Sequence, residues 1–394
     1  MSSNAQESGS ALPLPQGSAI GILGGGQLGR MSAIAASLLG YRVVVLSSDP
    51  DDPAVAVSHK HICAEVEDRK ALAELAELAD IVTYEREQLP LASVTWLSER
   101  VAVAPNCLAL EVAQDRIREK SFFSSTGIPT VPWRPVTSVS EIVAAADDVG
   151  RPAIFKVAYG GYDGKGQATI EVGETDEALF ALWERFSNGA EMMGIVERKV
   201  AFDCELSVIV ARDRQGKMVT YDPSLNNHKN HILDTSSVPV PVGEKQLDEA
   251  RTMVCKIAEG LDYVGVLCLE LFLMPSGELL ANEIAPRPHN SGHWTIDACY
   301  TDQFEQLIRA IAGLPLGDPS RFTDVCMKNI IGSDAEDISP YLNAPNAKLH
   351  LYGKQDIRPG RKMGHVTYLG INDPAGMAEA KTNSLALPNW RSNG

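Results

Sequence analysis

The segment Asn282–Trp294, NEIAPRPHNSGHW, concentrates side chains that can do chemistry. It carries an acid, a guanidinium, two imidazoles and an amide, at Glu283, Arg287, His289, His293 and Asn290. Its prolines and its Asn-Ser-Gly run are poorly compatible with an ordinary helix. An apolar run that contains Glu270 comes shortly before it. Two neighbouring strands that each end in an acid can point both carboxylates at one place, which suits magnesium held between protein and nucleotide phosphates.

Two other interpretations of this segment are weaker. A surface loop with satisfied polar groups is one, but different reactive side chains rarely crowd a loop that only connects elements. A zinc site is the other, because His289 and His293 have the i, i+4 spacing of a helical zinc pair. Asn-Ser-Gly between them is poor helix, and no third ligand stands at a familiar spacing. We therefore expect the residues after Glu283 to hold a small anion beside a magnesium ion.

Composition excludes several classes of protein. The 394 residues are enough for two or three domains. The net charge of −16 argues against a nucleic-acid partner or an anionic-membrane partner, since either needs a basic surface. Seven scattered cysteines without a C-x-x-C pair favour a reduced, cytoplasmic protein. The polar start of the chain lacks the apolar core of a signal peptide, and no apolar stretch reaches the roughly 18–20 residues that span a bilayer.

The sequence of the N-terminal part of the chain predicts alternating strands and helices. Strands are expected over Ser18–Leu23, Arg42–Leu46 and Ile81–Thr83. Helices are expected from the GGGQLG turn to Leu39 and over Ala71–Leu78. This alternation predicts a parallel sheet with both faces covered. We expect a disordered extension over 1–17, an N-terminal unit over 18–112, a central unit over 113–312 and a β-rich unit with a tail over 313–394.

The later units mix helices with an antiparallel sheet. Helices are predicted over Arg116–Ser124, Val139–Val149, Leu247–Gly260 and Phe304–Ile311. Strands are predicted over Ala153–Val157, Ile195–Arg198, Cys204–Val210 and Met218–Tyr221, the last three in one antiparallel sheet. The segment from His350 to Gly370 is typical of a hairpin.

Glycines Gly24, Gly26 and Gly29 form G-x-G-x-x-G between a strand and a helix, and Asp49 follows the next strand. The pattern satisfies the dinucleotide-binding fingerprint and is the feature that favours an oxidoreductase. A tight strand-to-helix turn needs the same glycines, and its helix N-terminus can hold any phosphate. Nothing later supplies a hydride-transfer site, so we expect no nicotinamide cofactor.

A second glycine-rich loop, KVAYGGYDGKGQ from Lys156 to Gln167, has the composition of a phosphate-binding flap. Its glycines let backbone N–H groups approach a polyphosphate, and Lys156 and Lys165 can neutralise the charge. The spacing is not that of a Walker A loop, and a plain glycine-rich hairpin is the alternative. Downstream, Glu197 ends an apolar strand whose flanking backbone can pair with an adenine edge, while Glu205 can accept hydrogen bonds from ribose hydroxyls.

These pieces together resemble the ATP-grasp superfamily. Five motifs between Gly21 and about Gly370 narrow the match. They are GILGGGQLGRM (Gly21–Met31), TYE-x-E (Thr83–Glu87), GGYDGKGQ (Gly160–Gln167), NEIAPRPHNSGHW, and HLYGK…RPGRKMGH (His350–His365). By these motifs, which recur in family order, the chain resembles the family of 5-(carboxyamino)imidazole ribonucleotide synthetases of purine biosynthesis. RPHNSGHW and RPGRKMGH are highly specific, whereas GGGQLG alone is weak.

The resemblance implies an α/β fold with an N-terminal Rossmann-like parallel-sheet domain, a central ATP-grasp domain and a small β-rich C-terminal domain. It implies that ATP phosphorylates bicarbonate to carboxyphosphate, which then carboxylates the exocyclic amine of aminoimidazole ribonucleotide. It further implies a cytoplasmic homodimer, with product passed to a separate mutase because no mutase domain follows.

The resemblance also assigns residues. ATP contacts are implied for Arg116, Lys156, Gly161, Tyr162, Asp163, Gly164, Lys165, Gly166, Gln167, Glu197, Arg198, Lys199, Val200, Glu205, His228, Asn282 and Glu283. Magnesium, with manganese as the alternative, is assigned to Glu270 and Glu283. Bicarbonate or its phosphorylated form is assigned to Arg287, His289 and Asn290. The ribonucleotide site adds Gln27, Leu28, Glu85, Lys354, Arg361 and Lys362 to these three. The residues with catalytic roles are Asp163, as base for the amine proton, Arg287, His289, Asn290 and Lys354.

The chain departs from the family pattern in places. An E-N-x-H segment is usual where this chain has Leu225-Asn226-Asn227-His228, and His231 replaces a glycine. Arg86 and Gln88 stand where an aromatic residue and an asparagine are usual, and residues after Gly370 do not align. The alternative functions are another ATP-grasp ligase, such as a formate-dependent glycinamide ribonucleotide transformylase, a non-catalytic nucleotide-binding regulator, or an NAD-dependent oxidoreductase.

Overall fold

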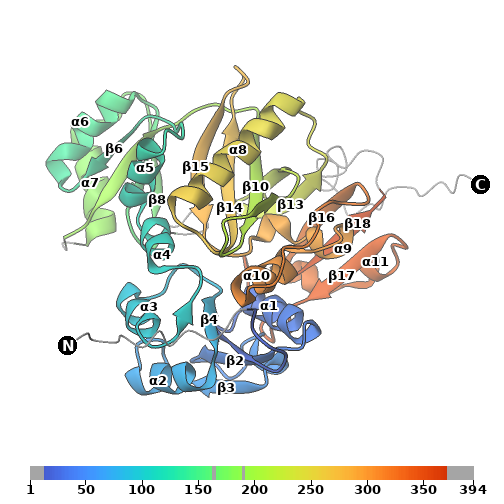
Figure 1. The fold of residues 1–394 in the computed structure, drawn as a ribbon. Helices are drawn as coiled ribbons and strands as arrows, with labels where there is room; N and C mark the ends of the chain where they lie inside the picture. The colour runs from blue at the N-terminus through green and yellow to red at the C-terminus, as the bar shows by residue number, and fades with distance from the viewer. Residues whose placement is uncertain (1–12, 162–165, 189–190, 371–394) are drawn as a thin grey trace, which may run out of the picture.

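The protein is described by a computed structural model that covers residues 13–161, 166–188 and 191–370 (Figure 1). Predictions for Tyr162, Asp163, Gly164 and Lys165, for residues 1–12 of the extension and for the tail 371–394 lie outside the described residues. None of the helices within these described ranges is long and apolar enough to cross a membrane.

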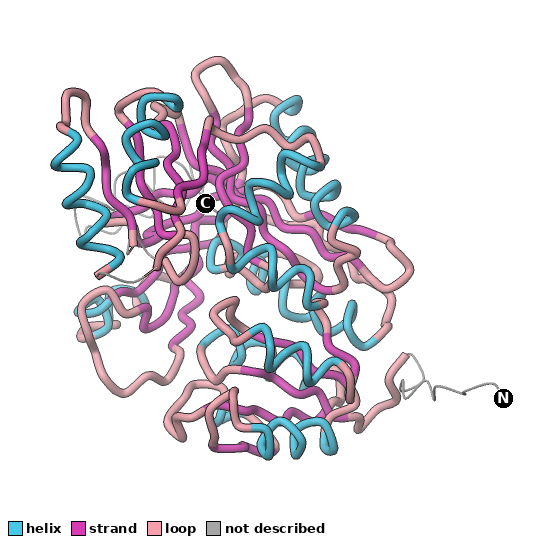
Figure 2. Tube along the Cα trace, turned by 90° about the vertical axis from the view of Figure 1, so that its left-hand side faces the viewer, coloured by secondary structure: helices cyan, strands magenta, loops and turns pink. Residues whose placement is uncertain are grey.

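The first unit is a five-stranded parallel sheet. Its strands are β1 (Ala19–Leu23), β2 (Arg42–Ser47), β3 (Lys60–Cys63), β4 (Ile81–Tyr84) and β5 (Ala102–Val103), in the order β3-β2-β1-β4-β5. The helices of this unit are α1 (Gln27–Leu38), the 3-10 turn η1 (Val55–Val57), α2 (Arg69–Leu78), α3 (Leu91–Ser98) and α4 (Cys107–Gln114). Figure 2 shows helices on both sides of the sheet, which confirms the predicted arrangement. Both faces are covered, so β1 is apolar and buried along its whole length.

A four-stranded antiparallel sheet follows, in the order β6-β9-β7-β8. Its strands are β6 (Trp133–Val136), β7 (Ala153–Val157), β8 (Gln167–Ile170) and β9 (Gly194–Arg198). The helices α6 (Val139–Val149) and α7 (Asp176–Ser187) pack on it through a shared apolar cluster that includes Phe155 and Trp183. The helix α5 (Arg116–Ser125) comes before this sheet in the chain. It contacts β9 of this sheet and also β15 (Leu279–Ala285), which belongs to the next sheet.

A nine-stranded sheet forms the rest of the molecule, in the order β15-β14-β10-β12-β13-β16-β18-β17, with β11 beside β10. Its strands are β10 (Cys204–Arg212), β11 (Met218–Thr220), β12 (Ser224–Lys229), β13 (Ile232–Val238), β14 (Gly265–Leu273), β15 (Leu279–Ala285), β16 (Val325–Ile331), β17 (Ala347–Leu351) and β18 (Lys362–Leu369). Its helical segments are α8 (Glu244–Gly260), η2 (Asn290–Gly292), α9 (Thr295–Ala298), α10 (Gln303–Ala312), η3 (Gly332–Ala335) and α11 (Ser339–Leu342).

One sheet prediction was wrong. Ile195–Arg198 was expected to share an antiparallel sheet with Cys204–Val210 and Met218–Tyr221, but β9 lies between β6 and β7, while β10 and β11 belong to the nine-stranded sheet. The periodicity of a strand reports its local conformation and not its partner, so it cannot assign neighbouring strands to one sheet. The predicted hairpin of the His350 segment is confirmed, since β17 pairs with β18.

The C-terminal strands continue the sheet of the central unit. β13 pairs with β16 from Thr235 opposite Lys328 to Val238 opposite Val325. Strands from both sides of the predicted boundary at residues 312 and 313 therefore share one hydrogen-bonded ladder. The division of the chain into separate units at that point stays a prediction.

Candidate active site

A cavity of about 540 Å³ is lined by residues of the N-terminal turn, of α5 and of strands from both antiparallel sheets. Many residues predicted for the site line it, although they come from segments far apart in the chain. These residues are Gln27, Leu28, Glu85, Arg116, Lys156, Gly161, Gln167, Glu205, His228, Glu270, Asn282, Glu283, Arg287, His289, Asn290 and Lys362. The predicted residues that the structure describes but that do not line it are Gly166, Glu197, Arg198, Lys199, Val200, Lys354 and Arg361.

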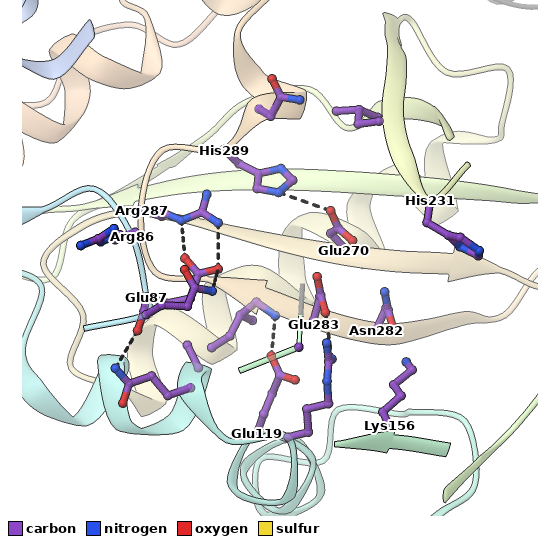
Figure 3. A pocket seen from close by; sticks show the side chains of 18 of the residues that line it. Arg86, Glu87, Glu119, Lys156, His231, Glu270, Asn282, Glu283, Arg287 and His289 are labelled. Carbon is purple, nitrogen blue, oxygen red and sulfur yellow. Dashed lines mark hydrogen bonds and ion pairs between the residues drawn. The ribbon is translucent and has the colours of Figure 1, made fainter. Parts of the chain in front are cut away.

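A β-bulge gathers the acidic residues. In the β14–β15 pair Leu269 is opposite Ile284, but Leu271 is opposite Ala281. One residue, Glu270, therefore faces two residues, Asn282 and Glu283. Regular alternation would send adjacent side chains of β15 to opposite faces, whereas a bulge re-aims one of them. Glu270, Asn282 and Glu283 all line the cavity, as Figure 3 shows.

The two acids have different neighbours and different acidities. Burial, together with the charge of Glu283, raises the pKa of Glu270 to about 7. Burial also acts on Glu283, but the nearby Arg116 and Lys156 hold the pKa of that carboxyl below its usual range. An Arg116 guanidinium nitrogen lies 3.0 Å from Glu283 Oε2. Of the two carboxyl groups, Glu270 is thus the one that keeps its proton to the higher pH.

The expected phosphate lysine belongs to a buried ion-pair chain. Lys156 Nζ lies 2.5 Å from one oxygen of Glu197, and Lys120 Nζ lies 2.8 Å from the other oxygen. Burial opposes ionisation of Glu197, yet the two lysines hold its pKa well below the usual range. Glu197 is 3% exposed, so its side chain supports Lys156 from behind the cavity wall.

The sequence interpretation missed two charged residues on α5. Glu119 and Lys120 are almost fully buried, and they contact the backbone of the bulge. Burial, and after it the charge of Glu283, raises the pKa of Glu119 to about 8. Neither residue belongs to a motif. The available signal was a weak one, namely two adjacent charges on the same helix as the buried Phe123.

The residues of the predicted anion site lie beside Glu270 in the same cavity. Arg287 pairs with Glu87 through two guanidinium nitrogens, at 2.5 and 2.9 Å. Burial would raise the pKa of Glu87, but the charge and hydrogen bonds of Arg287 lower it to about 2. Glu87 was not assigned a role from the sequence, although it ends the TYE-x-E motif. A bidentate pair of this kind fixes the plane of the guanidinium, as Figure 3 shows.

The His289 imidazole is held from several sides. Its Nε2 lies 3.3 Å from Glu270 Oε1, and its Nδ1 lies 2.8 Å from the Ser291 hydroxyl. Gln303 of α10 binds the His289 backbone on both sides, accepting from its N–H and donating to its carbonyl at 2.8 Å each. Burial, followed by the charge of Arg287, lowers the pKa of His289 to about 3. The ring is therefore neutral at physiological pH.

The glycines of the first turn surround a carboxylate. Glu85 accepts hydrogen bonds from the Gly26 amide at 2.5 Å and the Gly29 amide at 2.8 Å. A Cβ atom on Gly24 or Gly26 would lie 2.7 Å from Glu85, which explains why these positions lack a side chain. The amides that would bind a pyrophosphate in a dinucleotide fold are thus taken by the protein's own acid.

The predicted basic residues Lys354, Arg361 and Lys362 lie near this turn. Lys354 and Arg361 are on the segment between β17 and β18, and Lys362 is the first residue of β18. Lys354 donates from Nζ to the Lys362 carbonyl at 2.8 Å, and Arg361 donates to the Asp356 carbonyl at 2.9 Å. Burial, and then the charge of Arg361, lowers the pKa of Lys354 to about 8, while Glu85 acts in the opposite direction. These mutual effects place the three basic residues near one another and near Glu85.

Another part of the wall suits a base and a sugar. His228 Nδ1 lies 2.5 Å from Glu205 Oε2. The backbone amide of Arg198 donates a hydrogen bond to the Pro132 carbonyl at 2.9 Å, and that of Lys199 donates to the Pro152 carbonyl at 3.0 Å. An aromatic pair that the sequence interpretation missed, Phe202 and Phe272, also lines the cavity. Its rings stack with centroids 4.6 Å apart, a flat apolar surface of the kind that binds bases.

Three family models match successive parts of the chain. The ribonucleotide synthetase preATP-grasp domain matches residues 18–114, the ATP-grasp domain matches 121–304, and the phosphoribosylaminoimidazole carboxylase C-terminal domain matches 325–378. The N5-carboxyaminoimidazole ribonucleotide synthase of Brucella melitensis biotype 1 is 47% identical over 354 residues, which are 90% of this chain and 97% of that protein.

The chain belongs to the N5-carboxyaminoimidazole ribonucleotide synthase family. Solved structures of the family agree with this fold. The Staphylococcus aureus N5-carboxyaminoimidazole synthetase complexed with ADP has a TM-score of 0.87 at 35% identity and covers 95% of this chain and 98% of its own. The Aspergillus clavatus synthase, in complex with ADP and 5-aminoimidazole ribonucleotide, has a TM-score of 0.84 at 28% identity over 94% of this chain and 98% of its own.

Membership of the synthase family confirms the predicted fold class, an ATP-grasp fold with an N-terminal parallel sheet and a C-terminal domain. The comparisons favour the carboxylating family over the transformylase and oxidoreductase alternatives. The roles assigned to individual residues remain predictions.

Proposed function

We propose that this chain is an ATP-grasp ligase that carboxylates 5-aminoimidazole ribonucleotide with bicarbonate. The products are 5-(carboxyamino)imidazole ribonucleotide (the N5-carboxyaminoimidazole ribonucleotide of the family name), ADP and phosphate, in purine biosynthesis. The observation that carries the proposal is a single cavity lined by Lys156, the Glu270–Glu283 bulge, the Arg287–His289 corner and the Glu85 turn. Residues assigned to the ATP phosphates, to the anion and to the ribonucleotide therefore line one space, which supports the proposal.

Magnesium, with manganese as an alternative, fits the bulge. Glu270 and Glu283 are like charges that face one cavity, with side chains 18% and 41% exposed. Desolvation and the charge of Glu283 raise the pKa of Glu270 to about 7, so a divalent cation would stabilise both carboxylates. The part of the chain that the structure describes contains no cluster of three or more His, Cys, Asp or Glu that could hold a metal. Magnesium commonly uses one or two carboxylates together with substrate phosphates. When bound, it would neutralise charge on the transferring phosphoryl group.

Arg287, His289 and Asn290 are the proposed holders of bicarbonate and carboxyphosphate. Arg287 supplies fixed positive charge, and the neutral His289 ring can donate or accept a hydrogen bond. Asn290 Nδ2 is buried and has no hydrogen-bond partner among the described residues, so it is a donor available to an anion. Such donors stabilise negative charge most where water is excluded.

The ribonucleotide is assigned to the other side of the cavity. Gln27, Leu28 and Glu85 would contact its sugar and base, and Lys354, Arg361 and Lys362 would contact its phosphate. Asp163, which lies outside the described residues, keeps its proposed role as the base that accepts the amine proton. A carboxylate suits that step, because the attacking amine gains positive charge.

We also propose a cytoplasmic homodimer whose product passes to a separate mutase. The reduced compartment is supported by the cysteines, none of which is paired with another in the described residues. The dimer and the mutase rest on the family resemblance alone.

Phosphate release from ATP tests the function. Release should require both 5-aminoimidazole ribonucleotide and bicarbonate for full rate, and a carboxylated ribonucleotide should appear in equal amount by mass spectrometry. Activity with formate and glycinamide ribonucleotide instead would contradict the proposal.

Glu283→Gln tests the metal assignment within that assay. The variant keeps the shape of the side chain but loses its charge, so phosphate release should fall by several orders of magnitude, because charge neutralisation at the phosphoryl group contributes several kcal/mol. Normal turnover by a folded Glu283→Gln protein would show that this carboxylate does not serve the metal.

A further inference from the structure

We propose that Glu119 and Lys120 of α5 are positioning residues for the nucleotide and metal site. They hold the bulge that carries Glu283, and they connect it to the lysine that faces the phosphates. The inference rests on the proposed function, because it concerns how the same site is kept in shape. Lys120 does not line the cavity, whereas Glu119 does, with one carboxyl oxygen bonded to the Ile284 amide. The proposed role of both residues is to position the site and not to bind the metal or carry out chemistry.

Glu119 and Lys120 cover the outer edge of β15. This strand is the last one in its sheet, and Ala281 on its outer side is paired only through an isolated bridge with Thr130, in which its amide donates to the Pro129 carbonyl at 2.8 Å. The Ile284 amide donates to Glu119 Oε1 at 2.7 Å, and Lys120 Nζ donates to the Asn282 carbonyl at 2.8 Å. One acceptor and one donor from α5 thus replace what a further strand would supply.

Glu283 lies in the chain between Asn282 and Ile284, the two residues whose backbone is hydrogen-bonded by α5. Its chain neighbours, Asn282 and Ile284, are each fixed by a buried side chain, with Glu119 2% and Lys120 1% exposed. A bulge interrupts the regular ladder that otherwise determines where a side chain points. The contacts from α5 therefore fix the direction of the Glu283 carboxylate, as outer partners commonly do for metal ligands.

Lys120 also reaches the other sheet. Its Nζ lies 2.8 Å from Glu197 Oε1 on β9, and the second oxygen of Glu197 lies 2.5 Å from Lys156 Nζ on β7. A continuous buried chain thus runs from the Asn282 carbonyl through Lys120 and Glu197 to Lys156. It ties β15, the edge strand of the nine-stranded sheet, to β9 and β7, the two interior strands of the four-stranded sheet.

Variants of Glu119 separate positioning from simple stability. Glu119→Gln keeps an acceptor oxygen for the Ile284 amide, whereas Glu119→Leu removes it. Lys328→Met is the matched control, because it breaks another buried pair, with Asp234 at 2.6 Å, and Lys328 does not line the cavity. Binding of Mn²⁺ in the presence of ADP, measured by electron paramagnetic resonance, reports on the site without turnover.

We expect Glu119→Leu to weaken Mn²⁺ binding by on the order of tenfold to a hundredfold, as loss of a partner behind a metal ligand does. Glu119→Gln and Lys328→Met should bind Mn²⁺ as the wild-type protein does. Lys120→Met should weaken both Mn²⁺ and metal-free ADP binding, because Glu197 and Lys156 lose their support. The Michaelis constant for the ribonucleotide should stay unchanged in the Glu119 variants.

The possible results distinguish a failure of this positioning role from a failure of the proposed function. A folded Glu119→Leu protein with wild-type Mn²⁺ affinity would overturn the inference, as would equal losses in Glu119→Gln and Glu119→Leu. If Glu119→Leu does not fold, Lys120→Met decides the question from the carbonyl side of the bulge. A wild-type protein that bound neither ADP nor Mn²⁺ with ADP would overturn the proposed function itself.

Discussion

Carboxyl groups in one cavity differ in acidity because their nearest charges differ. Burial would raise the pKa of Glu87, but its bidentate contact with Arg287 lowers it to about 2. Burial and the charge of Glu283 instead raise the pKa of Glu270 to about 7. Glu87 is therefore an anion at neutral pH and orients Arg287, whereas the raised pKa of Glu270 leaves that carboxyl only partly ionised there.

Lys354 predicts a pH dependence of ribonucleotide use. Burial and the neighbouring Arg361 lower its pKa to about 8, so the side chain is cationic below that pH and loses its charge above it. If the cation binds the ribonucleotide phosphate, kcat/KM for 5-aminoimidazole ribonucleotide should fall as pH rises through about 8. Lys354→Arg keeps its charge throughout, so its profile should lack this fall. The same fall in both proteins would assign the titration to another group.

Replacing His231 with glycine should make the protein more stable to unfolding. It adopts φ +63° at the tip of the β12–β13 hairpin, a conformation that favours glycine. His231→Gly should raise the free energy of unfolding by about 1 kcal/mol, measured as a higher Tm without ligand. His231→Ala is the control, because it removes the imidazole but keeps the Cβ atom, and it should give no gain. Equal Tm values for the Gly and Ala variants would contradict the account.

Sequence patterns identified the residues that act within one motif. The acids Glu270 and Glu283 and the Arg287–Asn290 group were recognised because their types and spacing are unusual for a connecting loop. Glu87 and Lys120 were missed because their partners are distant in the chain: Arg287 is 200 residues from Glu87, and Asn282 is 162 residues from Lys120. No local pattern records such a pairing.

At the scale of elements, the bulge in β15 is the feature that sequence could not predict. Helix and strand positions follow from periodicity, and the predicted Val139–Val149 and Ala153–Val157 coincide with α6 and β7. Periodicity places Asn282 and Glu283 on opposite faces of a strand. One extra residue, which changes no composition, brings both to the cavity. Strand partners are equally hidden, which is why β9 was assigned to the wrong sheet.

Helix α10 provides a matched pair of glutamines. Gln303 binds the His289 backbone through its carbonyl and amide groups, at 2.8 Å each. Gln306, one turn later, makes the same pair of bonds to Gly317, at 2.8 and 2.9 Å. Both side chains are fully buried. The two residues differ in the backbone that they hold, and Gln303 in addition contacts His293 Nδ1 at 3.1 Å.

Replacing each glutamine with leucine should separate stability from activity. Both variants leave buried backbone groups unpaired, so each should lose about 1–3 kcal/mol of stability, seen as a lower Tm. Gln303→Leu should also lower kcat by on the order of tenfold or more, because His289 is no longer held in place. Gln306→Leu should keep wild-type kcat at a temperature where it is folded. Equal effects on kcat would mean that α10 matters only for stability.

At the scale of the whole molecule, the nine-stranded sheet joins units that the motifs suggest are separate. Four consecutive residues of β13, Thr235–Val238, pair with β16. A chain that stops after residue 320 would leave this buried edge without its partner. We expect such a chain to be insoluble, and co-expression of a fragment starting at residue 321 to restore soluble protein. A soluble truncated chain with a cooperative thermal transition would show that the central unit folds alone.

The shared sheet also has a consequence in time. β13 ends at Val238 and β16 begins at Val325, so 86 residues (325 − 238 − 1) lie between the two strands. Ribosomes add about 5–20 residues per second, so the edge of a newly made β13 waits about 4–17 seconds for its partner. An apolar edge would be a template for aggregation during that wait. Asp234, Thr235, Ser236 and Ser237 are polar although they are buried in the folded protein, so this edge exposes less apolar surface during the wait than an ordinary buried strand would.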